Sequence, residues 1–289
     1  MTQLRQQLIQ ELVLRGMAER TQEAYIHHVY HLAKHFRLSP DQLSDAQVRA
    51  YLFDLADKRK LSASTVNQAV NAFRFFYEHV VHREVEALRR ALPHPRKAIR
   101  RPEVFSIQEI QKLLTVGAVH PMHRAFLMTV YGAGLRLNEA CHLKFEHLDR
   151  ARRQIRVEEG KGQKDRYTLL SPRLLQELEQ YWRVCRPKHW LFPSVRDPQR
   201  PMLDGTAQKI YYAAIKRAGL RRKGGIHALR HSFATHLLEA GVEITALQRL
   251  LGHANLSTTS LDWHVRQERL AEITGPLDLL DLRSVLPES

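Results

Sequence analysis

Hydrophobic residues recur at helical spacing along most of this chain. In the N-terminal third, an apolar residue returns every three or four positions in four segments, at about residues 2–15, 19–36, 44–57 and 63–79. Ser44 and Ser62 stand where the N-caps of the last two helices are expected. The pattern predicts a helical N-terminal domain over residues 1–90.

The second half is again helical, with one short β interruption. Ser106 and Glu109 have the spacing of a capping box, and a further helix is expected over about residues 122–131. The alternating runs QIRVEE and DRYTLL are joined by GKGQK, which predicts a hairpin with Lys161 at its tip. The fold class is therefore mainly α with a small β-sheet, the C-terminal domain of 105–289 being α+β.

Between these regions lies a proline-rich, basic stretch, ALPHPRKAIRRPEV, at residues 91–104. Three prolines disfavour a continuous helix, so the stretch is expected to be an exposed interdomain linker. Its cations are Arg96, Lys97, Arg100 and Arg101. These four residues are candidate DNA contacts.

Charge identifies the class of partner. The chain carries 45 Lys and Arg against 30 Asp and Glu, a net charge of +15, which favours a polyanion such as double-stranded DNA. A hydrophobic content of 44% excludes a disordered basic tail. No apolar run is long enough for a membrane span, and the N-terminus does not resemble a signal peptide, so a cytoplasmic location is expected. Cys141 and Cys185 are expected to be reduced packing residues.

Three histidines in one predicted helix raise the question of a metal. His27, His31 and His35 recur every four residues. Imidazoles spread over two helical turns diverge too far for one tetrahedral ion, and no nearby cysteine completes a ligand set. We therefore predict a polar face, directed toward DNA, and no metal site.

The C-terminal half contains residues suited to phosphate chemistry. In YGAGLRLNEA two glycines precede Arg136 at the start of a helix, although a surface pair with Glu139 is an equally good interpretation of that segment alone. His227 and Arg230 lie one helical turn apart, so both can face one phosphate. His253 follows Leu-Gly at a helix end, where an imidazole can point into a cleft.

Lys161 completes this set. A lysine on a mobile hairpin can protonate a departing alkoxide, although a solvated turn residue is the simpler interpretation. Together the five residues would surround a phosphodiester with positive charge and proton donors. Such a site can stabilise a pentacoordinate transition state without a metal or another cofactor.

The motifs YGAGLRLNEA, the GKG hairpin, HALRHSFATHLL and LGHANLSTT resemble the tyrosine recombinase (phage integrase) family. The intervals from Arg230 to His253 and from His253 to Asp262 are similar to those of bacterial members, whether Xer-like recombinases or integron and transposon integrases. The resemblance implies a helical, SAM-like core-binding domain followed by a catalytic domain. It also implies a homotetramer synapsed on DNA.

Site roles follow from the same resemblance. Arg136 and Arg230 would clamp the scissile phosphate, His227 and His253 would hydrogen-bond it, and Lys161 would be the general acid. The family's nucleophile is a tyrosine that forms a 3′-phosphotyrosine, and this chain has Asp262 at that position.

Asp262 is a serious departure. A carboxylate is shorter than a phenol, is ionised at neutral pH with an unperturbed pKa of about 3.9, and would form a hydrolysis-prone acyl phosphate. The last tyrosines in the chain are Tyr211 and Tyr212, and every copy in a homo-oligomer would carry Asp262.

The expected function is therefore site-specific DNA recombination with cleavage and rejoining lost or impaired. Two alternatives are open: a sequence-specific DNA-binding protein derived from a recombinase, and a nuclease in which Asp262 activates water. Natural decay and an altered sequence are both open as origins of Asp262. We expect a bacterial protein that is associated with the nucleoid.

Overall fold

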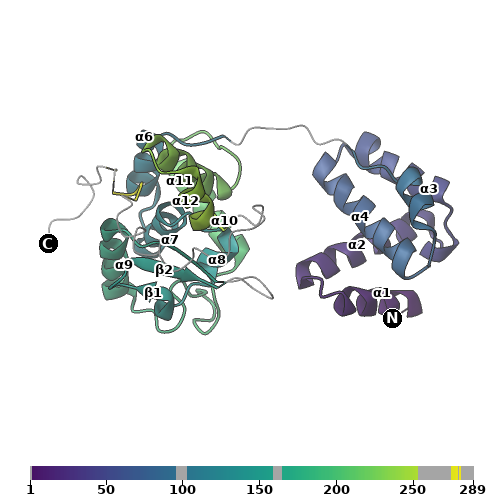
Figure 1. Ribbon diagram of the computed structural model, residues 1–289, viewed down its shortest axis with the longest axis horizontal. Coiled ribbons are helices and arrows are strands. Elements are labelled where there is room, and N and C mark those ends of the chain that lie inside the picture. The colour runs from purple at the N-terminus through teal and green to yellow at the C-terminus, as the bar shows by residue number, and fades with distance from the viewer. Residues whose placement is uncertain (1, 96–102, 159–164, 253–274, 279, 281–289) are drawn as a thin grey trace. The chain divides into compact units, whose positions relative to one another are not determined.

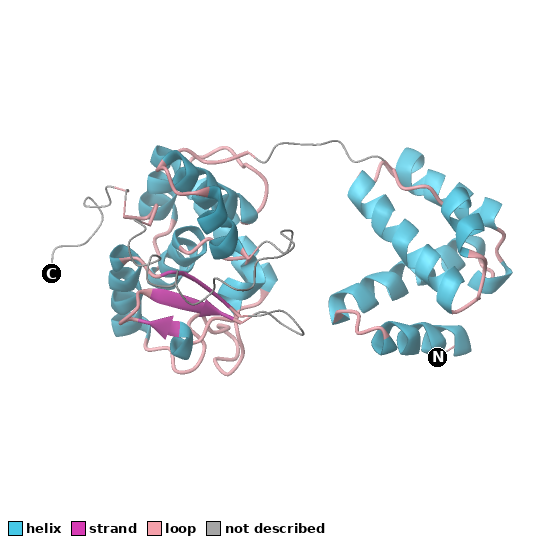
Figure 2. Cartoon of the chain, in the orientation of Figure 1, coloured by secondary structure: helices cyan, strands magenta, loops and turns pink. Residues whose placement is uncertain are grey.

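The computed structural model describes residues 2–95, 103–158, 165–252, 275–278 and 280. The chain forms two compact units, residues 1–100 and 101–289 (Figure 1). Helices dominate both, and the three strands all lie in the C-terminal unit (Figure 2). The predicted fold class, mainly α with a small β-sheet, is confirmed.

The N-terminal unit is helical throughout its described length. Its helices are α1 (Gln3–Leu14), α2 (Glu19–Phe36), the 3-10 turn η1 (Pro40–Gln42), α3 (Asp45–Phe53), the π-helical turn η2 (Asp54–Lys58), α4 (Ala63–His79) and α5 (Val85–Ala91). Helix α4 is the central one, with nine of its side chains buried, and it packs against α2. Phe73 and Tyr77 of α4 are fully buried in this core.

The predicted caps are present. Ser44 and Gln47 form a reciprocal capping box at α3, and Ser62 Oγ accepts a hydrogen bond from Thr65 N (3.2 Å) at α4. Two details differ from the prediction. The third helix changes at Asp54 to a π-helical turn, and α5 adds a short helix beyond the four expected segments.

The start of the proline-rich stretch packs onto the N-terminal unit. On its N-terminal side, Leu92 is buried, and its carbonyl accepts hydrogen bonds from Arg74 of α4. Asn67 Nδ2 donates to Pro95 O (3.0 Å). The polar core residue Asn67 thus attaches the start of the linker to α4. The candidate DNA contacts Arg96, Lys97, Arg100 and Arg101 lie outside the described residues.

The C-terminal unit surrounds one buried helix. Its elements are α6 (Ile107–Lys112), the π-helical turn η3 (Leu113–Gly117), α7 (Pro121–Gly132), α8 (Leu137–Cys141), the 3-10 turn η4 (Phe145–His147), β1 (Leu148–Asp149), β2 (Gln154–Val157), β3 (Arg166–Leu169), α9 (Pro172–Cys185), α10 (Asp204–Arg217), α11 (His227–Glu239) and α12 (Ile244–Leu251). Nine of the twelve residues of α7 are buried, and it packs against α9 and α11.

The predicted hairpin is confirmed. Strands β2 and β3 are antiparallel, with Val157 opposite Arg166, and the sheet order is β1-β2-β3. Strand β1 was not predicted, because two residues are too few to show an alternating pattern. Eight residues join β2 to β3, and six of them, 159–164, which include Lys161, lie outside the described part.

A short described segment near the C-terminus packs onto its own unit. Leu277 is fully buried against Gly132 at the end of α7, and Asp278 Oδ1 accepts a hydrogen bond from Arg173 N (3.2 Å) at the start of α9. The described residues of this segment therefore place two leucines, Leu277 and Leu280, in the core of the same unit.

Two further expectations have outcomes. Cys141 and Cys185 are both free thiols, but only Cys141 is buried; Cys185 is exposed at the end of α9, so its expected packing role is wrong. Among the residues that the structure describes, each helix is too short or too polar to cross a bilayer.

Acid should destabilise the C-terminal unit. Burial lowers the pKa of His123 and His147 below the ordinary histidine value. The unfolded chain therefore binds more protons than the folded one as pH falls through about 6.5, and stability declines. Trp182 and Trp190 lie in the described part of this unit, and residues 1–100 contain no tryptophan, so tryptophan fluorescence reports the unfolding of this unit.

We expect the urea concentration at the midpoint of unfolding, followed by tryptophan fluorescence, to be lower at about pH 5.5 than at about pH 7.5. Both pH values lie above the ordinary range of carboxylate titration, so the change reports histidines. Equal midpoints at the two pH values would contradict this prediction.

Candidate active site: three arginines around one buried glutamate

Glu139 is the centre of a charge cluster in the C-terminal unit. It is the third residue of α8, where its carboxylate accepts a hydrogen bond from Arg136 N (2.7 Å) and caps the helix. The Arg136 side chain also binds it, Nη1 to Oε1, at 2.7 Å. The pair that the sequence suggested is present. It is not an ordinary surface pair, because the Glu139 side chain is only 10% exposed.

Two more guanidinium groups face the same carboxylate. Arg166 of β3 donates from Nη1 to Oε1 (2.9 Å) and from Nη2 to Oε2 (2.7 Å), a bidentate pair. Arg230 of α11 approaches Oε2 to 3.8 Å. Three positive charges and one negative charge give this cluster a net charge of +2.

The pKa of Glu139 reflects this setting. Burial alone would raise it, but the hydrogen bonds and charge of Arg166, with further hydrogen bonds from Arg136, bring it below the usual value. Glu139 is therefore ionised at neutral pH. The cluster is a fixed arrangement of charges.

The same arginines hold the end of α12. Each donates one hydrogen bond to a different backbone carbonyl there: Arg166 Nε to Leu250 O (3.1 Å), Arg230 Nη2 to Leu251 O (2.5 Å) and Arg136 Nη2 to Gly252 O (2.8 Å). The C-terminal end of a helix carries partial negative charge, so cations are favourable at this place. The next residue in the chain is His253, which lies outside the described residues.

Glycine is required at Gly134, in the turn from α7 to α8. Its φ is +61°, and an added Cβ would lie 2.4 Å from the ring of Phe233 in α11. This close approach brings Gly134 O within 2.8 Å of Arg230 Nη1, which donates to it. The glycine-rich motif therefore allows α8 and α11 to present Arg136 and Arg230 to the same carboxylate.

His227 lies at the start of α11, one turn before Arg230. The residue is exposed overall, but desolvation of its ring and then the positive charge of Arg230 lower its pKa, while Asp204 and Glu139 act in the opposite direction. The imidazole is therefore mainly neutral at pH 7, and a neutral ring can both donate and accept a proton.

The opposite face of α11 is bound to the start of the C-terminal unit. Phe105 N donates to Ser232 Oγ (2.8 Å), and His236 Nε2 donates to Phe105 O (2.9 Å). His236 Nδ1 is also within 2.9 Å of the Tyr131 hydroxyl. The chain thus enters this unit directly against the helix that carries His227 and Arg230.

The structure therefore brings Arg136 and Arg230 together and places His227 one helical turn from Arg230. Lys161, His253 and Asp262 lie outside the described residues. Arg166 was not recognised in the sequence as a member of this cluster. The sequence carried no clear signal for it, because the burial of Arg166 on the inward face of β3, which requires an anionic partner, is seen only in the structure.

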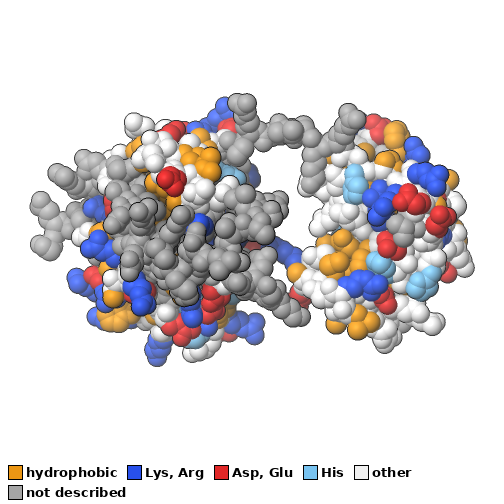
Figure 3. Space-filling view, in the orientation of Figure 1, with side chains coloured by type: hydrophobic (Ala, Val, Ile, Leu, Met, Phe, Trp, Pro, Cys, Tyr) orange, Lys and Arg blue, Asp and Glu red, His pale blue; other side chains and the backbone are white. Residues whose placement is uncertain are grey.

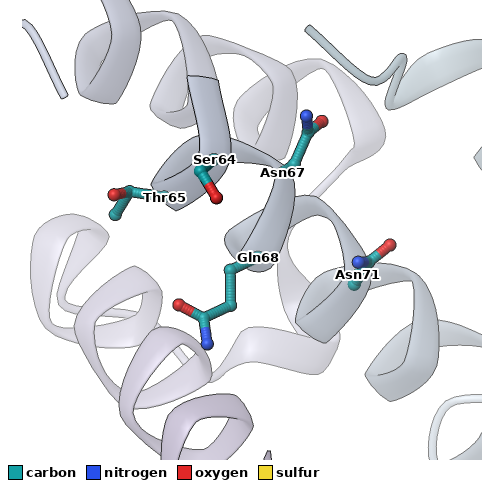
Figure 4. A pocket seen from close by; sticks show the side chains of 5 residues that line it. All are labelled: Ser64, Thr65, Asn67, Gln68 and Asn71. Carbon is teal, nitrogen blue, oxygen red and sulfur yellow. The ribbon is translucent and has the colours of Figure 1, made fainter. Parts of the chain in front are cut away.

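The N-terminal unit presents a different kind of surface. An uncharged groove on α4 is lined by Ser64, Thr65, Asn67, Gln68 and Asn71 (Figure 4). Ser64, Gln68 and Asn71 are exposed, whereas Asn67 is buried and bonded to the linker. Elsewhere, acidic, basic and histidine side chains are interspersed on the visible face of this unit (Figure 3).

The three histidines of α2 do not converge. The ring centroids of His27 and His31 are 4.3 Å apart, but the ring of His35 packs against Phe36 and Tyr51. Over the described residues, the structure shows no group of three potential ligand side chains placed to hold a metal ion.

Comparison with known proteins decides the family. Residues 103–269 match the Phage integrase family, and residues 4–87 match its N-terminal SAM-like domain. The chain belongs to the phage integrase family. The resemblance found in the sequence motifs is thereby confirmed for both domains.

Relatives cover nearly the whole chain. It is 40% identical over 285 residues to an inferred integrase/recombinase of Sinorhizobium fredii, covering 97% of this chain and 90% of the relative. It is 33% identical over 278 residues to tyrosine recombinase XerA of Pyrococcus horikoshii, covering 93% and 92%. A lambda integrase dimer bound to a core site shares the fold, with a TM-score of 0.70, 17% identity and coverage of 89% and 98%.

The cluster should contribute strongly to stability. Glu139→Gln would leave three guanidinium groups facing each other without their common anion, and removing one partner of a buried ion pair costs about 3 kcal/mol. We expect the free energy of unfolding, measured by urea titration of tryptophan fluorescence, to fall by about that amount.

Glu146→Gln is the matched control. It removes an exposed carboxylate that pairs with Lys144, and it should leave the urea midpoint unchanged. Equal midpoints for Glu139→Gln and the parent chain would show that the cluster does not stabilise the fold.

Proposed function

We propose that this chain binds duplex DNA as a member of the phage integrase family, grips a phosphodiester in the Glu139 cluster, and is impaired in strand cleavage by Asp262. The observation that supports this most directly is the convergence of three guanidinium groups on one carboxylate. A net charge of +2 at a preorganised site is suited to a phosphate anion.

The proposed chemistry uses the charge of the cluster. Arg136, 40% exposed, and Arg230 would contact the non-bridging oxygens of the scissile phosphate, where charge accumulates in the pentacoordinate transition state. Neutral His227 would hydrogen-bond the same group. His253 and Lys161 are proposed as the second histidine ligand and the general acid. The exchange conserves phosphodiester energy, so neither a cofactor nor ATP is needed.

Cleavage requires a nucleophile, and Asp262 is a poor one for this reaction. A carboxylate would add negative charge beside the phosphate and yield an acyl phosphate that water hydrolyses. Tyr211 is fully buried, and burial raises the pKa of its hydroxyl well above the usual value. The Tyr212 hydroxyl accepts a hydrogen bond from Arg222 Nη2 (2.6 Å). Neither described tyrosine is arranged as a substitute.

We assign the N-terminal domain to residues 1–90, the linker to 91–104 and the catalytic domain to 105–289. Arg96, Lys97, Arg100 and Arg101 of the linker would contact the DNA backbone. The exposed side chains of the α4 groove, Gln68 and Asn71 in particular, have the hydrogen-bonding groups that pair with base edges in a major groove. Sequence discrimination is therefore proposed for α4, and backbone affinity for the linker and the cluster.

We propose a homotetramer on DNA, because a solved structure with the same fold is a tetramer. A lambda integrase tetramer bound to a Holliday junction has the same fold, with a TM-score of 0.71 and 17% identity. Action on bacterial DNA would place this chain in the cytoplasm, at the nucleoid. The second candidate function, sequence-specific DNA binding without cleavage, is favoured by Asp262 itself, since a chain that lacks the tyrosine can still bind DNA through its arginines and its linker.

Restoring the nucleophile should restore cleavage. We expect the parent chain to leave supercoiled plasmid intact, and Asp262→Tyr to relax it and form a covalent protein–DNA adduct. Adding Arg230→Ala to Asp262→Tyr should slow relaxation by at least about 100-fold, as loss of one transition-state donor does. Relaxation and adduct gels measure both effects without knowledge of the recombination site.

The other outcomes are also decisive. Adducts from the parent chain as well would mean that another residue attacks. Nicked plasmid without an adduct would indicate the nuclease. If neither chain relaxes the plasmid or forms an adduct, and both still bind DNA, the non-catalytic DNA-binding protein is favoured.

The salt dependence of DNA binding should distinguish the two proposed DNA contacts, the Glu139 cluster and the α4 groove. For a duplex selected by the protein from a random pool, log Kd should rise linearly with log salt concentration, and Arg136→Ala should lower that slope by about one. Gln68→Ala should leave the slope unchanged but reduce discrimination against a scrambled duplex by about 1–3 kcal/mol. A slope altered by Gln68→Ala, or unaltered by Arg136→Ala, would contradict the assignment.

A further inference from the structure

We propose that Arg166 is a positioning residue that neutralises Glu139, so that Arg136 and Arg230 retain their charge for a phosphate. This inference rests on the proposed function of the cluster. Arg166 would act through Glu139 and α12 and would not itself contact DNA.

The geometry distinguishes Arg166 from its two neighbours. Its guanidinium forms the bidentate pair with Glu139, whereas Arg230 approaches the carboxylate only to 3.8 Å and donates to the backbone carbonyls of Gly134 and Leu251. The Arg166 side chain is 5% exposed, against 40% for Arg136. The Arg230 side chain is nearly as buried, at 8%, so the bidentate pair is what separates Arg166 from both neighbours: its two Nη atoms are engaged by the Glu139 carboxylate.

Charge explains why the pairing matters. The hydrogen bonds of Arg166 are the largest influence that opposes burial in keeping Glu139 ionised. Without Arg166 the carboxylate would draw Arg136 and Arg230 toward itself, because an unpaired buried anion is strongly unfavourable. The net charge of the cluster would fall from +2 to +1, and the two remaining arginines would be less available to a ligand.

Arg166 also links the parts of the proposed site. It is the first residue of β3, directly after the loop that contains Lys161, and its Nε holds Leu250 O at the end of α12. Two residues later Thr168 Oγ1 donates to Ala133 O (2.7 Å), in the turn that leads to Arg136. One strand therefore fixes the base of the hairpin, the start of α8 and the end of α12 against one another.

The test is a double-mutant cycle on DNA binding, a measurement that does not require cleavage. Arg166→Met leaves Glu139 uncompensated and should weaken binding to the selected duplex by at least about tenfold, with a shallower salt dependence. Arg166→Met combined with Glu139→Gln removes both charges, restores the net charge of +2, and should recover most of the affinity and of the salt slope. A role in packing alone would give no such recovery.

Arg166→Lys is the conservative variant. It keeps the positive charge but cannot form the bidentate pair, so its affinity should stay within about threefold of the parent chain. This variant also decides the matter if Arg166→Met fails to fold, as monitored by tryptophan fluorescence. Loss of tenfold or more in a folded Arg166→Lys chain, or a double variant weaker than Arg166→Met, would overturn the inference.

Failure of this inference can be told apart from failure of the proposed function. If Arg136→Ala and Arg230→Ala together leave DNA binding unchanged, the cluster is not a phosphate site and the proposed function fails. If that pair weakens binding and Arg166→Met does not, only the positioning role of Arg166 is wrong.

Discussion

The candidate site depends on one interaction, the burial of the Glu139 carboxylate among three guanidinium groups. An anion removed from water is tolerated only where opposite charge and hydrogen bonds replace its hydration. Glu139 meets this condition because α8, β3 and α11 each bring one arginine to it. Elements far apart in the sequence are thereby held in one arrangement, and the end of α12 is bound to the same three side chains.

The cluster combines stability with unbalanced charge. One carboxylate does not neutralise three arginines, and the carbonyls at the end of α12 supply only partial negative charge. In the proposed function a phosphodiester, with one negative charge, would offset part of this excess. The α4 groove differs, because its lining side chains form hydrogen bonds without charge, and for this reason we propose that it recognises bases more than backbone.

Local features of the fold were predictable because their causes are local. Ser44, Ser62 and Ser106 cap helices where the sequence places them, and the GKGQK connection joins two antiparallel strands as its alternating flanks require. Features that arise from packing were missed. The exposure of Cys185, the short strand β1 and the helix α5 depend on neighbours that periodicity does not reveal.

The sequence by itself determined the helical class, the two-domain division and the family, because motifs and hydrophobic spacing are written in order along the chain. From the same motifs we infer that Asp262 stands at the position of the family's nucleophile. Only the tertiary structure decided that Arg136 and Glu139 form more than a surface pair, and that Arg166 shares their carboxylate. The reason is physical: a buried charge selects its partners by distance in space, and 27 residues of chain separate Glu139 from Arg166.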